Sequence, residues 1–188
     1  VRKFRTNPIA NRSIWNDNPS MNRLLASRVE TPIGAMRMMA REGVLLLLEF
    51  EDTGERIARQ MAARFPEAQI LERDDPFDFV SRLSAYFAGD FHSLDDIISD
   101  GGGTAFETAV WRLLRTIPVG ETWSYGQLAA ALGSPGASRA VGRANALNPV
   151  AIVVPCHRVI GADGTMTGYG GGLARKEWLL AHERALLV

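Results

Sequence analysis

Cys156 is the residue with the most chemical potential in this chain, and it is the only cysteine among 188 residues. It lies in the run Pro155-Cys-His-Arg-Val159, next to His157. A cysteine reacts as its thiolate, and a neighbouring base or cation lowers the thiol pKa enough to supply that form. Neighbours on an extended strand point to opposite faces, so these two side chains can cooperate only if Pro155 begins a turn or short helix. The run therefore predicts a nucleophilic cysteine on a turn.

Metal and cofactor chemistry find no support in the rest of the sequence. One cysteine can form neither an intramolecular disulfide nor a cysteine-based zinc cluster. The three histidines, at 92, 157 and 182, do not have metal-ligand spacing. No Gly-x-Gly-x-x-Gly follows a predicted strand, and there is no P-loop. We expect no metal and no cofactor.

Two short helices joined by a tight turn are predicted before the cysteine. The first covers residues 124–132 with Ser124 as its N-cap, Gly133-Ser-Pro-Gly136 forms the turn, and the second covers residues 138–147. This is the layout of a helix-turn-helix, and the small, basic second helix suits close approach to a DNA groove. The apolar run 150–154 that follows is typical of a buried strand leading into the cysteine.

The segments before residue 124 are predicted to supply the framework. Segments 28–31, 35–40 and 43–50 indicate an antiparallel meander, and helices are expected over 55–65 and 77–87. The run Asp100-Gly-Gly-Gly-Thr104 is expected to be a flexible hinge. Thr104 and Glu107 are predicted to form a capping box for a helix over 105–116, with Phe106 among its core-facing residues.

These elements predict an α+β or α/β protein of two domains. Residues 1–23 are expected to be a tail or linker, and residues 24–100 a small N-terminal domain with an antiparallel sheet and helices. Residues 104–188 are expected to form a mainly helical domain that carries the helix-turn-helix and Cys156, and the family resemblance described below implies that it binds DNA.

The composition, with 46% hydrophobic and 22% charged residues and a formal net charge of +0, is that of an ordinary globular protein. Residues 1–100 carry 13 basic and 16 acidic side chains, whereas residues 101–188 carry 8 and 5. This mild basic bias is far below that of a strong phosphate-tracking protein, so any DNA binding should have a modest salt dependence. No apolar run reaches the roughly 18 to 20 residues of a membrane span, and no signal peptide is evident, so a cytoplasmic protein is expected.

The motifs together resemble one family. Pro155-Cys-His-Arg-Val159 is similar to the signature of the O6-alkylguanine-DNA alkyltransferases, or methylated-DNA–protein-cysteine S-methyltransferases. The flanking segments agree with that family in order and spacing: Ile117-Pro-Val-Gly120, Ser124-Tyr125, Arg139-Ala-Val141, Asn145, Asn148-Pro149, Gly168-Tyr169 and Lys176-Glu-Trp-Leu-Leu-Ala-His-Glu183. The resemblance is dense over residues 104–184, loose over 28–100 and absent before residue 24.

The resemblance implies single-turnover DNA repair, in which an alkyl group moves irreversibly from O6 of guanine in duplex DNA to Cys156. Glu183 corresponds to the residue that orients His157, and His157 to the base that deprotonates Cys156 through a bridging water. Tyr125 corresponds to the tyrosine that helps to rotate the nucleotide and bonds guanine N3. Because a thioether is a poor leaving group, the protein should be consumed in one reaction.

The resemblance also implies a DNA surface that binds through the minor groove. The target O6 lies inside the base stack, so the nucleotide must be flipped out. Arg139 corresponds to the arginine that takes its place in the stack. The DNA-binding residues expected on this basis are Tyr125, Ala137, Ser138, Arg139, Gly142 and Asn148.

A substrate pocket is implied as well, and its expected residues are Val159, Tyr169, Gly170 and Lys176. Many relatives have serine after this tyrosine, so Gly170 leaves the contact to O6 to a backbone N–H and widens the pocket for larger alkyl groups. Structural roles are implied for Asn148, which braces the turn before the active-site strand, and for Arg158, which packs the site against the N-terminal part.

Three other interpretations stay open. Alkyltransferase-like proteins bind damaged DNA without catalysis but replace the cysteine, and Cys156 argues against that class. A cysteine hydrolase would need an oxyanion-stabilising context, which the sequence lacks. Residues 1–23 leave open that the chain is the C-terminal module of a longer regulator. We expect a monomer, and the sequence fixes neither the preferred alkyl size nor the repair of O4-alkylthymine.

Overall fold

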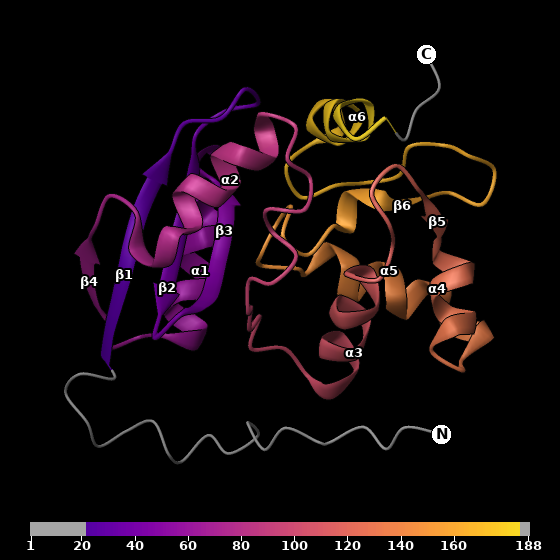
Figure 1. Ribbon diagram of the computed structural model, residues 1–188. Helices are drawn as coiled ribbons and strands as arrows, with labels where there is room; N and C mark the ends of the chain where they lie inside the picture. The colour runs from indigo at the N-terminus through magenta and orange to yellow at the C-terminus, as the bar shows by residue number, and fades with distance from the viewer. Residues whose placement is uncertain (1–21, 185–188) are drawn as a thin grey trace, which may run out of the picture.

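The computed structural model describes residues 22–184, which form a sheet-bearing part and a mainly helical part side by side (Figure 1). The sheet has the order β3-β2-β1-β4. Its strands are β1 (Arg23–Val29), β2 (Met36–Arg41), β3 (Val44–Phe50) and β4 (Gln69–Glu72). The predicted mixture of an antiparallel sheet, helices and a helical second part is confirmed.

β1, β2 and β3 form the predicted antiparallel meander, but the sheet differs from the prediction at two points. β1 begins at Arg23 rather than Arg28, with Leu24 and Ala26 fully buried between more exposed neighbours. β4 adds a fourth strand, parallel to β1. Three of the four residues of β4 are exposed, so this strand lacks the apolar alternation by which a strand is found in a sequence.

The two faces of the sheet are covered by different elements. Helix α1 (Gly54–Arg64) packs on one face through Ile57, Met61 and the following Phe65. Helix α2 (Phe79–Phe87) and the helical part share a second cluster with the other face. The strand residues in that second cluster are Val29, Met36, Met38, Ala40, Leu45, Leu48 and Phe50. A continuous core therefore joins the two parts of the chain.

The helical part contains α3 (Ala105–Leu114), α4 (Tyr125–Ala131), α5 (Ser138–Ala146) and α6 (Leu173–His182). The capping box of Thr104 and Glu107 is confirmed, and Ser124 caps α4 in the same manner with Gln127. The expectation that Phe106 faces the core is wrong, because its side chain is 38% exposed. Within residues 22–184, no helix is both long and apolar enough to cross a membrane.

The glycines before α3 serve packing rather than the flexibility expected of them. A Cβ atom on Gly101 would lie 2.2 Å from the ring of Trp111, and one on Gly103 would lie 2.5 Å from the same ring. Trp111 is 7% exposed, and its indole Nε1 donates to the carbonyl of Ala144 in α5 at 2.9 Å. The glycine run therefore lets the chain cross closely over a tryptophan that joins α3 to α5.

Residues 150–154 are buried, but they do not form the predicted strand. Apart from an isolated bridge between Val150 and Leu48, the segment is a series of turns, with Ile152 at a φ of 70°. The Val154 N–H donates to the carbonyl of Val150 at 3.0 Å, so the chain folds back on itself. An apolar run shows that a segment is buried, but it does not distinguish a strand from a buried turn.

The free edge of β3 holds this turn segment in place. The Leu48 N–H donates to the carbonyl of Pro149 at 2.9 Å, and the Ala151 N–H donates to the carbonyl of Leu48 at 2.8 Å. Further along the same edge, Leu45 exchanges hydrogen bonds with Ile98 and Asp100. The backbone that leads to Cys156 is thus fastened to the sheet.

Candidate active site

Cys156 begins a single turn of 3-10 helix, Cys156–Arg158, directly after Pro155. The prediction that the proline introduces a turn or short helix is confirmed. The cysteine is 6% exposed and unpaired. A short parallel pairing of β5 (Trp123–Ser124) with β6 (Val159–Ile160) follows the turn and ties it to the start of α4.

The side chain of Asn148 connects the end of α5 to the cysteine. Its Nδ2 donates to the carbonyl of Val154 at 2.9 Å and to Cys156 Sγ at 3.1 Å, while its Oδ1 accepts from the Val150 N–H at 3.0 Å. This geometry suits a brace for the turn. It does not suit the DNA contact that was also expected, because Asn148 is 2% exposed and its amide is used internally.

The cysteine differs from the expectation of a lowered thiol pKa. Burial raises the pKa of the Cys156 thiol to about 11, and the hydrogen bond from Asn148 opposes this only in part. The neutral thiol is therefore the resting form near neutral pH. Reaction of Cys156 as a thiolate would therefore require a base to remove the proton, since the surroundings do not supply a thiolate in advance.

Glu183 is a buried carboxylate with several hydrogen-bond donors around it. Its Oε1 lies 3.0 Å from His157 Nε2, 2.6 Å from the Tyr86 hydroxyl and 2.9 Å from Arg158 Nη2, and its Oε2 accepts from Arg158 Nε at 2.8 Å. Burial alone would raise the carboxyl pKa, but the hydrogen bonds and charges of His157 and Arg158 lower it well below its usual range. Glu183 is therefore ionised.

The ionised carboxylate fixes the state of His157. Burial lowers the pKa of this histidine, although Glu183 opposes the shift, so the ring is neutral. The ring nitrogen that faces a carboxylate carries the proton, which makes Nε2 the donor and leaves Nδ1 as an unprotonated base. Nδ1 is buried and has no hydrogen-bond partner among the residues that the structure describes. A proton acceptor is thus available one residue from Cys156.

Arg158 was expected to pack the site against the N-terminal part, and it lines a cavity together with Tyr86 and Phe91 of that part, but its hydrogen bonds lie elsewhere. Besides Glu183, its guanidinium donates to the carbonyl of Ile117 at 2.6 Å, and both partners belong to the helical part. We call the hydrogen-bonded group of His157, Arg158 and Glu183 the relay. The hydrogen bond between the relay and the N-terminal part comes from Tyr86 in α2. Tyr86 was not identified from the sequence, because a tyrosine in an amphipathic helix is typical of a core residue.

The residues expected to form the pocket lie around a loop before α6. Lys176 is fully buried, and its Nζ donates to the carbonyls of Val159 at 2.5 Å and Thr167 at 2.9 Å. Burial lowers the pKa of Lys176. The hydroxyl of Tyr169 is buried and has no hydrogen-bond partner within residues 22–184. Burial raises the pKa of Tyr169 well above its usual value, and the nearby Cys156 raises this pKa further.

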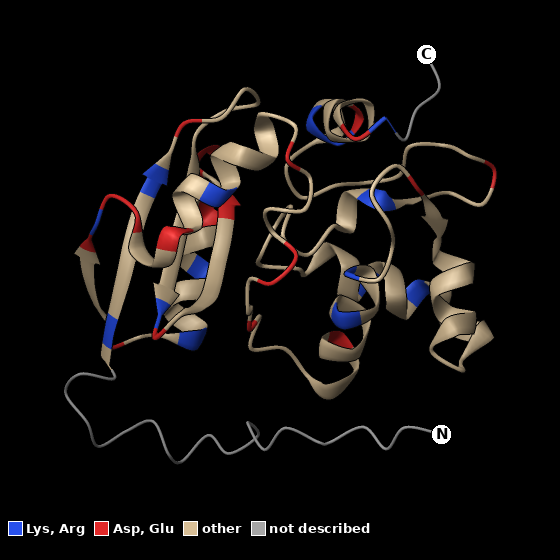
Figure 2. Ribbon diagram, in the orientation of Figure 1, with Lys and Arg blue, Asp and Glu red and all other residues tan. Residues whose placement is uncertain are grey.

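The residues expected to contact DNA, apart from Asn148, lie at least partly on the surface of α4 and α5. Arg139 is exposed, while Tyr125, Ala137, Ser138 and Gly142 are half-buried. The Tyr125 hydroxyl lies 2.9 Å from Thr167 Oγ1, which connects α4 to the segment that leads to α6. Figure 2 shows basic residues on α5 and no acidic residue on either helix. This surface is therefore open and positively charged.

Arg56 is a further residue at the site that sequence reasoning did not find. From α1 its Nη1 donates to the carbonyl of Ala146 and its Nη2 to that of Asn148, both at 2.7 Å, and its Nε pairs with Glu49 at 2.6 Å. It therefore holds the C-terminal end of α5 and the asparagine brace. The one sequence signal was Glu49, a charge in the apolar strand Val44–Phe50.

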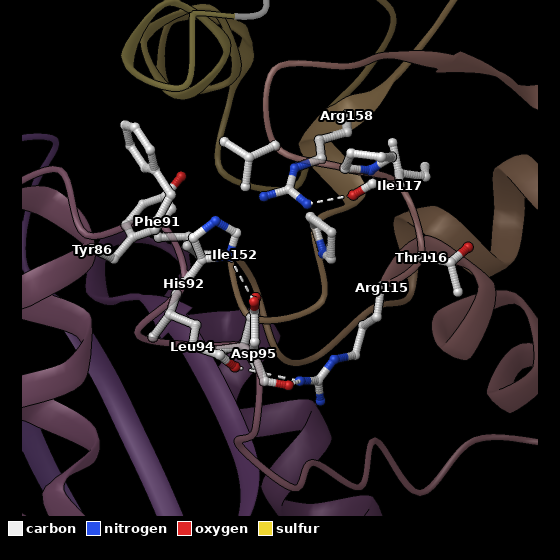
Figure 3. Close-up of a pocket in the computed structure, with 14 residues that line it drawn as sticks. Tyr86, Phe91, His92, Leu94, Asp95, Arg115, Thr116, Ile117, Ile152 and Arg158 are labelled. Atoms are coloured by element: carbon white, nitrogen blue, oxygen red, sulfur yellow. Dashed lines mark hydrogen bonds and ion pairs between the residues drawn. The ribbon is translucent and has the colours of Figure 1, made fainter.

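A cavity of about 250 Å³ lies between Tyr86 and Arg158 (Figure 3). Tyr86, Pro155 and Arg158 line it, but Cys156 does not. The guanidinium of Arg115 at its edge is committed to backbone carbonyls, including those of Ile97 at 2.6 Å and Asp95 at 2.7 Å. The cavity therefore borders Tyr86 and Arg158, two residues that donate to Glu183, and it does not reach Cys156.

Known proteins resemble this chain along most of its length. The family described as "6-O-methylguanine DNA methyltransferase, DNA binding domain" matches residues 105–185. A methylated-DNA–protein-cysteine methyltransferase of Shigella flexneri is 46% identical over 171 residues, covering 89% of this chain and 100% of the relative. One of Mycolicibacterium paratuberculosis is 49% identical over 83% of this chain and 90% of the relative.

Solved structures give the same result. The Mycobacterium tuberculosis OGT in complex with DNA has a TM-score of 0.73 and 42% identity, covering 86% of this chain and 93% of that one. The O6-methylguanine-DNA methyltransferase of Pyrococcus kodakaraensis has a TM-score of 0.66 and 29% identity, covering 85% and 98%.

The carboxylate of Glu183 should be the most costly polar group of the site to remove. In Glu183→Gln, Arg158 remains buried without its counter-charge, so we expect a loss of about 3–5 kcal/mol in the free energy of unfolding, measured with urea. Tyr86→Phe is the matched control, since it removes one donor and leaves the ion pair, and should cost less, about 1.5 kcal/mol, the lower end for a hydrogen bond to a charged group. Equal losses would show that the ion pair does not stabilise the fold.

The thiol of Cys156 should titrate near pH 11 in the folded protein, compared with about 8.5 in the unfolded chain. Because folding raises this pKa, the thiol's contribution to stability is complete below about pH 8.5 and is lost as the pH rises towards 11. Thiolate absorbance in the ultraviolet measures both midpoints, with Cys156→Ala as the blank. A folded midpoint at or below the unfolded one would contradict the burial argument.

Proposed function

The chain belongs to the methylated-DNA–protein-cysteine methyltransferase family, and on this premise we propose that it repairs O6-alkylguanine in double-stranded DNA by moving the alkyl group to Cys156. DNA repair by direct alkyl transfer is the activity of this family, and a DNA complex of a relative supports DNA as the partner. The observation that carries the assignment to Cys156 is the buried thiol, held by Asn148 and placed next to a histidine with an unused Nδ1.

The reaction is a displacement at the alkyl carbon. His157 Nδ1 accepts the thiol proton through a bridging water, and Glu183 stabilises the imidazolium that forms. Sγ then attacks the carbon bound to O6, the carbon–oxygen bond breaks, and its electrons stay with the guanine. The guanine takes up one proton, so a thiol and an alkylguanine become a thioether and a guanine. Lys176 and Tyr125 supply positive charge and a hydroxyl donor towards the leaving base.

DNA binds to the surface of α4 and α5 through its minor groove. Arg139 at the start of α5 is exposed and enters the base stack when the target nucleotide is rotated out. The small residues Ala137, Ser138 and Gly142 allow the helix to approach the groove closely. Tyr125 must release Thr167 Oγ1, its partner in this structure, before its hydroxyl can bond the rotated base.

The rotated base occupies a pocket formed by Val159, Tyr169, Gly170 and Lys176. Because the carbonyl of Val159 already accepts from Lys176, its part in the pocket is to hold this cation and to supply an apolar wall. A Cβ atom on Gly170 would lie 3.4 Å from Arg56 Nη1, so the absence of a side chain at this position leaves room beside the α1 arginine. The protein acts as a monomer on chromosomal DNA in the cytoplasm.

A non-catalytic damage binder is disfavoured by Cys156 itself, since a binder needs neither a thiol nor a base beside it. Residues 1–23, which bear on the interpretation as a module of a longer regulator, lie almost wholly outside the described residues.

Stoichiometry tests the proposed function most directly. With excess duplex DNA containing O6-methylguanine, transfer should stop at about one methyl group per protein molecule, since a thioether is not displaced by thiols. Intact-mass and peptide-mass measurements should place the methyl group on Cys156. Cys156→Ser should bind the same DNA but transfer nothing, because a hydroxyl is a far weaker nucleophile at neutral pH. Repeated turnover, or transfer by Cys156→Ser, would refute the proposal.

Arg139→Ala should separate base flipping from chemistry. We expect it to slow transfer from duplex DNA by roughly tenfold to a hundredfold, as loss of a few kcal/mol of flipping energy predicts. Transfer from free O6-benzylguanine, which needs no flipping, should be nearly unchanged. Arg143→Ala, on the same helix, is the matched control for loss of positive charge. Equal losses on both substrates would place Arg139 in the fold or the chemistry.

A further inference from the structure

We propose that Arg175 and the end of β3 hold the pocket loop, residues 168–172, in a closed position and thereby limit the size of the alkyl group that is transferred efficiently. This inference rests on the proposed function, because it concerns the same pocket. It assigns a positioning role to Arg175, Asp52 and Phe50, which do not contact the reacting atoms.

Arg175 connects the loop to the N-terminal part through most of its donors. Its Nη1 donates to the carbonyl of Gly171 at 3.0 Å and to Asp52 Oδ1 at 2.9 Å, and its Nη2 donates to Asp52 Oδ2 at 2.7 Å. Its Nε donates to the carbonyl of Ile33 at 2.7 Å. The loop carbonyl is therefore fixed by a guanidinium that the sheet-bearing part holds at two separate points.

The ring of Phe50 supports the same arrangement from below. The Arg175 guanidinium carbon lies 4.1 Å from the ring centroid, within the range of a cation–π contact. A Cβ atom on Gly171 would lie 2.6 Å from this ring, so the loop backbone rests directly on it. Phe50 is fully buried at the end of β3, and Asp52 follows it by two residues. The end of β3 and the turn that follows it thus supply the ring on which the loop packs and the carboxylate that binds Arg175.

Two neighbouring cations at the start of α6 hold opposite ends of the loop. Lys176 Nζ bonds the carbonyl of Thr167 before the loop, from inside the site, whereas Arg175 bonds the carbonyl of Gly171 at its end, from outside. The loop is also closed internally by the Gly172 N–H, which donates to the carbonyl of Tyr169 at 2.9 Å. With both ends fixed, the loop has little freedom to move away from Cys156.

The position of these cations indicates a specific role. Cations are unfavourable in the first turn of a helix, where the helix dipole is positive, and α6 has no acidic residue there. The carboxylate of Asp52, which reaches Arg175 from another part of the chain, offsets this repulsion. Helix α6 gains no stability from a cation in its first turn. The placement of Arg175 is therefore explained by the link that Arg175 forms between the loop and β3.

The consequence is selectivity by size. A loop held at both ends keeps the alkyl carbon of a small group aligned with Sγ, and misplacement of about 1 Å costs on the order of a hundredfold in rate. A bulky group needs the loop to move outward. Release of Arg175 should therefore slow transfer of a small group while it relieves the obstruction to a large one.

The test compares two duplexes, one with O6-methylguanine and one with O6-benzylguanine, in single-turnover transfer. Arg175→Ala and the milder Asp52→Asn should raise the benzyl-to-methyl rate ratio by roughly fivefold or more, mainly through slower methyl transfer. Arg82→Ala is the matched control, because it breaks a comparable surface ion pair, with Asp96, that includes no residue of the loop or of its contacts with β3. It should leave the ratio unchanged.

The outcomes separate the two proposals. If the unaltered protein transfers neither group, the proposed function fails. If it transfers both groups and Arg175→Ala and Asp52→Asn keep its rate ratio, the role of the loop link is refuted. Thermal unfolding of each variant guards against a general loss of structure, since that would slow both substrates alike. Asp52→Asn removes only an exposed charge, so it keeps the test valid if Arg175→Ala does not fold.

Discussion

The arrangement around the nucleophile depends on the burial of one charge, the carboxylate of Glu183. A carboxylate taken out of water is tolerated only when hydrogen bonds and opposite charge replace its hydration. Here the donors come from α2 through Tyr86 and from the turn after Pro155 through His157 and Arg158. Because one carboxylate must satisfy all three, it fixes the relative positions of α2, the nucleophile turn and the end of α6. The orientation of the histidine follows from this electrostatic requirement.

Burial also keeps Cys156 in the form of its unreactive neutral thiol. A thiol with a pKa of about 11 leaves on the order of one molecule in ten thousand as thiolate at pH 7. In the proposed reaction, proton transfer to His157 therefore has to coincide with the arrival of an electrophile. For a protein consumed by a single reaction this has a clear value, since a permanent thiolate would be lost to oxidation or to unrelated alkylating agents. The structure favours selective use of the cysteine over high intrinsic reactivity.

Local features of the fold could be predicted, whereas features that depend on distant contacts could not. The capping box at Thr104, the N-cap at Ser124 and the two helices of the helix-turn-helix depend on residues a few positions apart, and they are as expected. The run 150–154 is buried as predicted, but it forms turns instead of a strand, because burial does not specify backbone angles. Glu183 was found only through the family resemblance, because no spacing rule connects it to His157. Arg56 and Tyr86 meet partners some 90 residues away in the chain, and no local pattern reveals such contacts.

The sheet-bearing part contributes no reacting group, yet it determines where the reacting groups lie. The segments that carry the asparagine brace and the pocket loop have little regular structure, so many of their backbone groups need partners from elsewhere. The edge of β3 bonds the backbone of Pro149 and Ala151. Arg56 in α1 bonds the carbonyls of Ala146 and Asn148. Arg175, which packs on the ring of Phe50 in β3, bonds the carbonyl of Gly171. Each of these contacts ends on a segment next to the thiol, the proposed DNA surface or the proposed pocket. The N-terminal part is thus a template for the irregular segments of the active site, and for this reason the two parts share one core.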